Sequence, residues 1–222
     1  MNQSQDLKQQ REQQVKAFTE LIGIPNFKDT GMLEIALIHP SYSYEINSSK
    51  EVKDLLEKLY KRLVHLGDAI FSAIVTDCLF ESCPSCTIAE LTEGKKLLVD
   101  KSLLFEFAKQ LKLQHFCLLG KSQQGKPLDG QEKLFAEMFK AVFGAIYLEF
   151  GRDFSKARTW LNDSFLEEAI EELLEDEDEN DEDEDDEFDE YYDDSYVTTR
   201  DYLDMIGLHD FPDYGWAPGD DD

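Results

Sequence analysis

Basic residues are almost missing from the last quarter of this 222-residue sequence. Beyond Ser164, Arg200 is the only one of the 22 Lys and Arg, whereas 27 of the 49 Asp and Glu lie there. Residues 1–164 therefore have a net charge of −1, and residues 165–222 carry −26. A run of like charges repels itself and cannot bury apolar surface, so we expect a disordered acidic tail from residue 175 onward. The sequence pI of about 4.3 describes this tail and says nothing about the rest.

Long apolar runs are also missing. No 18 consecutive apolar residues occur, so no membrane span is expected, and the polar N-terminus has no apolar segment typical of a secretory signal. A cytoplasmic protein is the resulting expectation. Alternation of β-branched residues is nearly absent, whereas apolar residues recur every three or four positions, which predicts an all-α fold.

Cysteine is scarce, with four residues at positions 78, 83, 86 and 117. Their spacing has some likeness to an iron–sulfur pattern, and Cys83-Pro-Ser-Cys86 is also compatible with zinc or redox chemistry. The simpler interpretation is that Cys78 and Cys117, which lie in apolar stretches, are small core residues. A redox role for the other two stays open.

The apolar pattern divides the chain into three parts. Residues 1–16 form a polar, Gln-rich arm, residues 17–174 a helical domain, and residues 175–222 the tail, which ends in an apolar and aromatic cassette at 202–216. Asp153 is expected to cap the last helix of the domain, which runs from 154 to about 174. One helix raises a question, because it has Gly67 and the charged Asp68 in the middle of its apolar pattern.

Four blocks of this domain occur in the order of a known family. They are ALIHPSYSYE (36–45), RLVHLGDAIF (62–71), LTEGKKLLVDKSLL (91–104) and LFAEMFKAVFGAIYLEFG (134–151). Together they resemble the ribonuclease III domain, over roughly residues 17–165. The double-stranded-RNA-binding domain that usually follows in that family is not expected here, because the tail is too acidic and too short, so in size the chain is similar to the Mini-III type. The resemblance implies a ribonuclease III helical fold, close packing around Gly67, and a homodimer formed through the helix that carries Gly67.

The resemblance also implies a site for catalytic magnesium, held by four acids on two helices. Carried over to this sequence, one of these acids is kept as Asp68 and one is replaced by the longer Glu137. The other two positions hold Val64 and Lys140, and a further family glutamate falls on Lys61. Two carboxylates and one lysine sum to −1, against about −4 for the family's arrangement. A lysine at the metal position adds a repulsion of roughly 4 kcal/mol per unit charge at 4 Å. We therefore expect a catalytically impaired protein in which Lys140 neutralises Asp68 or Glu137.

Three functions are compatible with this pattern. The first is a pseudoenzyme that binds structured RNA in RNA processing or ribonucleoprotein assembly, with no cofactor. The second is an active endoribonuclease on double-stranded RNA, which would hold Mg²⁺ or Mn²⁺ with Asp68, Glu137 and a recruited Glu132 or Glu57. The third is a protein-interaction module whose acidic tail binds basic ribosomal or RNA-binding proteins. In the simplest alternative, Asp68 is an ordinary surface acid.

RNA binding would require basic side chains that contact phosphates. The candidates lie in two regions flanked by loops, and they could equally be ordinary surface lysines, because the domain has no overall basic bias. They are Lys95, Lys96, Lys101, Lys121, Lys126 and Lys133.

Overall fold

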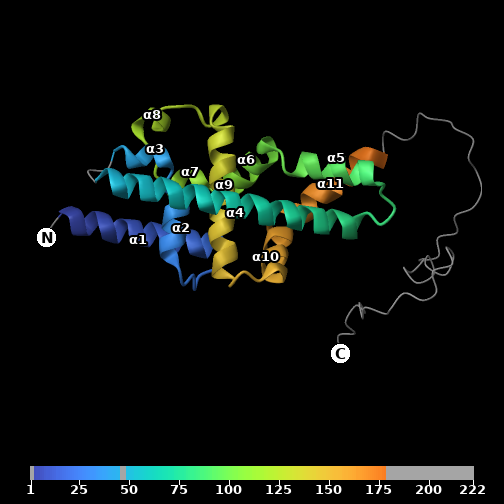
Figure 1. The fold of residues 1–222 in the computed structure, drawn as a ribbon, viewed down its shortest axis with the longest axis horizontal. Coiled ribbons are helices and arrows are strands. Elements are labelled where there is room, and N and C mark those ends of the chain that lie inside the picture. Colours follow the sequence, from blue (N-terminus) through green and yellow to red (C-terminus); the bar gives the residue numbers. More distant parts are fainter. Residues whose placement is uncertain (1–2, 46–48, 179–222) are drawn as a thin grey trace, which may run out of the picture. The chain divides into compact units, whose positions relative to one another are not determined.

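The computed structural model describes residues 3–45 and 49–178, and within these ranges the chain is helical (Figure 1). In the described part the only β-type pairing is an isolated bridge between Ile38 and Leu118, which confirms the all-α prediction. The acidic run from 179 and the terminal cassette lie outside the described residues. The helices are α1 Gln3–Leu21, α2 Thr30–Ala36, α3 Pro40–Ser43, α4 Lys50–Ser82, α5 Ile88–Leu98, α6 Lys101–Gln110, α7 Leu113–Phe116, α8 Lys121–Gln124, α9 Glu132–Glu149, α10 Phe154–Leu161 and α11 Glu167–Asp178, with a 3-10 turn η1 at Leu128–Gly130 and a π-helical segment η2 at Asn162–Leu166.

Side-chain caps mark the beginnings of five described helices, α2, α3, α5, α6 and α10. Asp29 accepts a hydrogen bond from the amide of Met32 at the start of α2, and Asp153 accepts one from the amide of Lys156 at the start of α10. Thr87 and Glu90 form a reciprocal capping box at the start of α5. Such caps satisfy amides that have no partner inside the helix, so these residues determine where the helices begin.

The N-terminal segment is part of α1. The helix begins at Gln3 instead of near residue 17, so the Gln-rich segment is continuous with it. Val15 and Phe18 are buried, and Nη1 of Arg11 donates a hydrogen bond of 2.6 Å to the carbonyl oxygen of Phe116. These contacts attach the segment to the domain, which its polar composition did not indicate.

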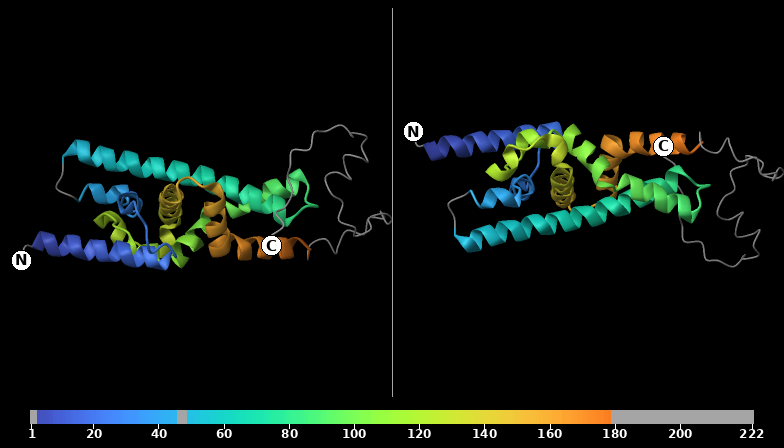
Figure 2. Two further views of the ribbon diagram at one scale, coloured as in Figure 1. Left: turned by 90° about the horizontal axis from the view of Figure 1, so that it is seen from below. Right: turned by 90° about the horizontal axis from the view of Figure 1, so that it is seen from above.

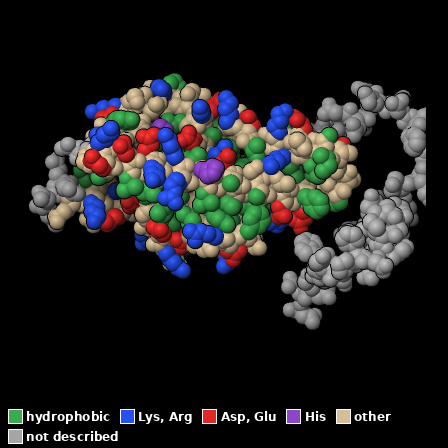
Figure 3. Space-filling view, viewed as in Figure 1, with side chains coloured by type: hydrophobic (Ala, Val, Ile, Leu, Met, Phe, Trp, Pro, Cys, Tyr) green, Lys and Arg blue, Asp and Glu red, His purple; other side chains and the backbone are tan. Residues whose placement is uncertain are grey.

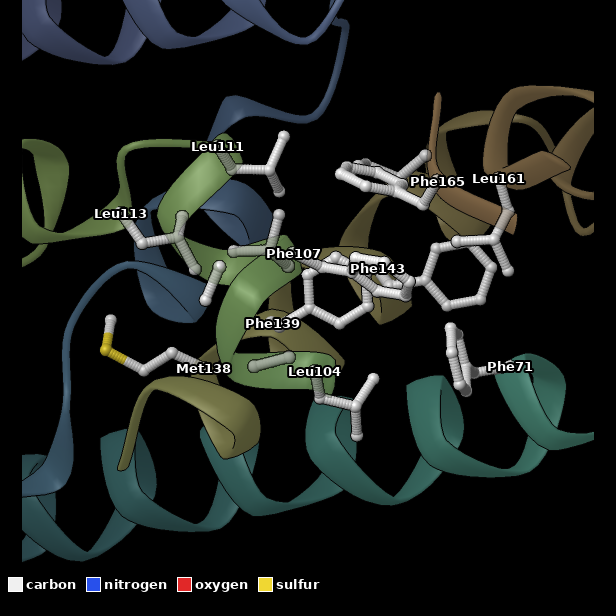
Figure 4. Packing of buried hydrophobic residues seen from close by; sticks show 14 of the residues in the cluster. Phe71, Leu104, Phe107, Leu111, Leu113, Met138, Phe139, Phe143, Leu161 and Phe165 are labelled. Carbon is white, nitrogen blue, oxygen red and sulfur yellow. The ribbon is translucent and has the colours of Figure 1, made fainter. Parts of the chain in front are cut away.

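Two long helices, α4 and α9, form the centre of the domain. α9 runs across α4 in Figure 1 and is seen along its axis in Figure 2. The buried side of α4 and most of α9 contribute aromatic rings to one core. The rings of Phe71 in α4 and Phe139 in α9 pack edge to face, with their centroids 5.9 Å apart. Phe107 of α6 and Phe165 of η2 close the cluster, with ring centroids 4.9 Å apart (Figure 4). Such pairs contribute beyond the area they bury.

By length and composition alone, α4 would also be able to cross a membrane, since one 18-residue window has a mean hydropathy of 1.6. However, 39% of that window is buried inside the domain. The core helix of a folded domain passes the same test, so this is weak evidence of a span.

The end of the domain differs from the single helix expected after Asp153. α10 changes into the π-helical segment η2, and α11 continues to Asp178. A π-helical turn holds an extra residue, which shifts the helical face. Here Phe165 and Leu166, although consecutive, are both buried. In a regular α-helix, consecutive residues lie about 100° apart. A search for that period assumes a regular helix, so it could not reveal the π-helical segment.

Candidate functional site

The crossing of α4 and α9 is built on two glycines. A Cβ atom added to Gly67 would lie 1.8 Å from the carbonyl oxygen of Lys140, and one added to Gly144 would lie 2.5 Å from the carbonyl oxygen of Leu63. The two backbones therefore touch, and each helix needs a residue without a side chain at the contact. This explains why α4 accepts a glycine in its interior, where glycine costs about 1 kcal/mol relative to alanine.

Asp68, the neighbour of Gly67, is paired across this crossing. Its Oδ1 lies 2.7 Å from Nζ of Lys140 in α9. The Lys140 side chain is 23% exposed and that of Asp68 is 55% exposed, so the pair lies at the edge of the crossing and is open to solvent on one side. The ion pair expected from the sequence is therefore present. It explains how an acid is tolerated beside the apolar face of α4.

The remaining predicted site residues gather at the same place. Glu137 precedes Lys140 by three residues, so both lie on one face of α9. Its charge acts on Tyr60 and on Lys61 of α4, which places Glu137 near them. Burial, and secondarily Glu137, raises the pKa of Tyr60 well above its usual range. Val64 is half-buried and packs against the core, so the position offers no ligand.

Neighbouring acids are occupied by other lysines. Glu57 accepts a 2.5 Å hydrogen bond from Nζ of Lys61, and this bond is the largest cause of the raised pKa of Lys61. Glu132 lies 3.5 Å from Nζ of Lys101. Within the described residues, no group of three or more His, Cys, Asp or Glu is placed to hold a metal ion. The donor set is thus two carboxylates, and one of them is bound to an ammonium that a Mg²⁺ ion would have to displace.

The six lysines proposed for RNA do not form one uninterrupted basic surface. Lys96 pairs with Glu93 at 2.9 Å, Lys101 with Glu132, and Lys121 with Glu45 at 3.6 Å. On the face shown in Figure 3, blue and red side chains alternate. Among the described acids, none is within ion-pair distance of the other three, which are Lys95, Lys126 and Lys133.

The cysteines do not form a cluster. Cys83 and Cys86 are joined in a disulfide between α4 and α5, Cys78 is buried in α4, and Cys117 is half-buried. The interpretation of Cys78 and Cys117 as core residues is confirmed, and the iron–sulfur and zinc alternatives are wrong for these positions. The sequence spacing allowed a disulfide, but it could not show which cysteines approach each other.

Cys117 provides a test of the packing beside α1. Burial raises the pKa of its thiol to about 11, from 9.0. Only the thiolate is alkylated, so at pH 8 we expect iodoacetamide to modify Cys117 in the folded protein about 100-fold more slowly than in the unfolded chain. The native rate should continue to rise above pH 9, whereas the rate in guanidinium should level off there. Mass spectrometry would locate the label, and a native rate that levels off near pH 9 would contradict this environment.

Comparison with known proteins identifies the family. The sequence model described as Ribonuclease-III-like matches residues 29–169. Proteins named Ribonuclease 3 from Oleidesulfovibrio alaskensis and Bdellovibrio bacteriovorus are 34% identical over 125 residues and 32% identical over 154 residues, covering 56% and 68% of this chain and 52% and 60% of those proteins. The chain thus spans about half the length of the curated relatives it matches.

Solved structures agree on the fold. A nuclease domain of ribonuclease III from Campylobacter jejuni superimposes with a TM-score of 0.54 at 24% identity, covering 72% of this chain and 99% of that domain. A second structure of that nuclease domain gives a TM-score of 0.52 at 25% identity. With the family match extending over more than half of the sequence, the chain belongs to the Ribonuclease-III-like family.

Proposed function

We propose that this protein binds structured or double-stranded RNA and acts as a binding or scaffold module in RNA processing or ribonucleoprotein assembly, without metal-dependent cleavage. The observation that carries the proposal is the ammonium of Lys140, 2.7 Å from Asp68 at the crossing of the two central helices. A cation already occupies the carboxylate that would have to hold the metal. Family membership supports RNA as the ligand.

The charges around Asp68 support the loss of cleavage. Asp68, Glu137 and Lys140 together carry −1, and Lys61 stands beside Glu137 as a second ammonium. A divalent ion would have to displace Lys140 from Asp68, and it would then have only two carboxylates, Asp68 and Glu137, as ligands. Each lysine left at about 4 Å repels each unit of metal charge by roughly 4 kcal/mol at an effective dielectric constant of 20.

RNA binding is expected to need no metal. Mixed with a short RNA duplex, the protein should shift its mobility equally in EDTA and in Mg²⁺, because lysines contact phosphates directly in this account. The affinity should fall steeply between 50 and 200 mM salt. A protein that fails to bind the duplex under low salt in either condition would refute the proposed function.

An active endoribonuclease is the second candidate. In its favour, Asp68 and Glu137 remain as acids on the two crossing helices, and Asp68 is half-exposed. Against it, Lys140 binds Asp68 at 2.7 Å, and Val64 and Lys140 stand where the resemblance places two of the four acids. The decisive assay is given at the end of the Discussion.

Assembly and location belong to the same proposal. We propose a cytoplasmic homodimer formed through the α4 region. The homodimer is supported by a solved nuclease domain that is described as having a region involved in dimer formation. Light scattering at tens of micromolar should then give about twice the chain mass of 25.6 kDa. A strictly monomeric mass would contradict the dimer.

The acidic tail is proposed to regulate RNA binding. Residues 179–222 hold 19 Asp and Glu and one Arg, a net charge of −18, and their attachment keeps them near the domain at an effective concentration of order mM. Carboxylates at that concentration should compete with phosphates for lysines, until a basic partner such as a ribosomal or RNA-binding protein removes them. The simpler alternative is that the tail only confers solubility.

Truncation after Asp178, which retains α11, separates these alternatives. If the tail competes with RNA, the shortened protein should bind duplex RNA several-fold more tightly at 50 mM salt. The difference should shrink at 300 mM salt, since both contacts are screened. Adding the 179–222 peptide in trans should reverse the gain. The same peptide with the order of residues 202–216 scrambled would test the cassette. Equal affinity before and after truncation would leave the solubility role alone.

A further inference from the structure

Four basic side chains share one face of α4. Lys58, Lys61, Arg62 and His65 follow the spacing i, i+3, i+4, i+7, which places them on the same side of a helix. All four are exposed, and no acidic residue occurs between the first and the last of them. These four residues are not among the lysines predicted to bind RNA. The sequence draws attention to Lys61 alone, as the replacement of a family glutamate.

The structure places this face beside the altered metal site. Lys61 occupies the position of a family glutamate, and it is close enough to Glu137 for that charge to act on it. Lys140 lies one to two turns further along, at the crossing with Asp68. We define the basic face as Lys58, Lys61, Arg62 and His65. Its C-terminal end borders the Asp68–Lys140 pair. Between Lys58 and Asp68 it extends about 15 Å along the helix.

The cations of this face are available. No described acid lies within ion-pair distance of Lys58 or Arg62, and the ammonium of Lys61 is bound only by Glu57, four residues earlier on the same helix. Exposed pairs of that kind contribute little, so an incoming phosphate can replace Glu57 at small cost. In Figure 3, basic and acidic side chains are intermixed over the first half of α4. Asp54 and Glu57 line the same surface as the four basic residues.

An exposed aromatic ring borders the same face. Tyr44, the C-cap of α3, is 74% exposed, and α3 packs against α4. The next residue, Glu45, pairs with Lys121 of α8 at 3.6 Å, so α8 brings a neutralised ion pair to this border. Cations with an interspersed exposed aromatic ring are typical of surfaces that bind a nucleic-acid backbone and stack on its bases.

We propose that this face of α4 is a track for the phosphates of an RNA strand, which the ammonium of Lys61 and the neighbouring cations bind directly where relatives would use metal. This inference rests on the proposed function and deepens it, because it assigns the RNA to α4 instead of the loop lysines. The substitution of acids by lysines then has a consequence beyond lost cleavage. A site that is acidic in the family's arrangement becomes one that attracts phosphate without a divalent ion.

The test compares two charge reversals of equal size. The variant Lys58→Glu/Arg62→Glu changes two exposed side chains of the basic face, and the control Lys8→Glu/Lys16→Glu changes two exposed side chains of α1. Both alter the net charge by the same amount, and circular dichroism checks that both fold. Affinity for a short RNA duplex is measured from 50 to 200 mM salt in EDTA. The α4 variant should bind at least tenfold more weakly, with a salt slope reduced by about two, and the control should keep the wild-type slope.

The outcomes separate the two proposals. If wild type does not bind the duplex, the proposed function fails and the phosphate track fails with it. If wild type binds and the α4 variant keeps its affinity and slope, while Lys126→Glu/Lys133→Glu loses both, RNA binding stands and the track is refuted. If the α4 variant weakens binding of the 179–222 peptide and leaves the RNA slope unchanged, the face binds the acidic tail instead, which also overturns the proposal.

Discussion

Replacing Gly67 with alanine is expected to destabilise the domain by about 3 kcal/mol or more. The new Cβ would lie 1.8 Å from the carbonyl oxygen of Lys140, and a backbone atom cannot move aside as a flexible side chain can. The central helices would have to separate along the core that contains Phe71 and Phe139. Overpacking of this kind commonly costs 1–3 kcal/mol, and a contact between backbones belongs at or above the upper end, about 3.

The sign of this result is informative, because helix propensity predicts the opposite. Glycine to alanine inside a helix normally stabilises by about 1 kcal/mol. Gly130→Ala is the matched control, since a Cβ there meets no atom within 4 Å. Urea unfolding should show the control near wild type and Gly67→Ala at a much lower midpoint with a similar slope. Equal stability of the two variants would show that the helices do not touch at Gly67.

Restoring the acids is expected to create a metal site. The double variant Val64→Glu/Lys140→Glu changes the local charge from −1 to −4 and removes the ammonium that lies 2.7 Å from Asp68. The new carboxylates would stand four residues before Asp68 on α4 and three residues after Glu137 on α9, so each pair shares a helix face. We expect Mn²⁺ to bind at least about 100-fold more tightly than to wild type, a difference of about 2.7 kcal/mol.

Two controls make this result specific. Adding Asp68→Asn to the double variant should abolish the gain, whereas adding Glu20→Gln on α1 should not, because Glu20 is an exposed acid on another helix. Mn²⁺ binding can be measured by electron paramagnetic resonance of the free ion, which needs no activity. Wild type that binds Mn²⁺ as tightly as the double variant would contradict the account of Lys140.

Much of this arrangement could be predicted from local sequence. The cap at Asp153 depends on a few neighbouring residues, so the pattern indicated that helix beginning correctly. The pairing of Asp68 with Lys140 could be inferred only because the family resemblance aligned two helices that are 72 positions apart. Neither composition nor periodicity contains that information.

Other features depend on contacts between distant segments. The attachment of the Gln-rich segment rests on the bond from Arg11 to Phe116, 105 residues later. The close approach of Gly144 to Leu63 depends on how α9 crosses α4. The basic face of α4 was visible in the spacing of Lys58, Lys61, Arg62 and His65, but its meaning required knowing that it is exposed and borders Glu137.

A cleavage assay tests the central claim most directly. The protein, in excess over an end-labelled RNA duplex that it binds, is incubated in Mg²⁺ and separately in Mn²⁺, and the RNA is resolved on a denaturing gel. We expect the duplex to be bound but intact in both metals, because Asp68 is paired with Lys140 and Val64 supplies no metal ligand. Metal-dependent cleavage by wild type that disappears in Asp68→Asn would contradict it and establish an active nuclease.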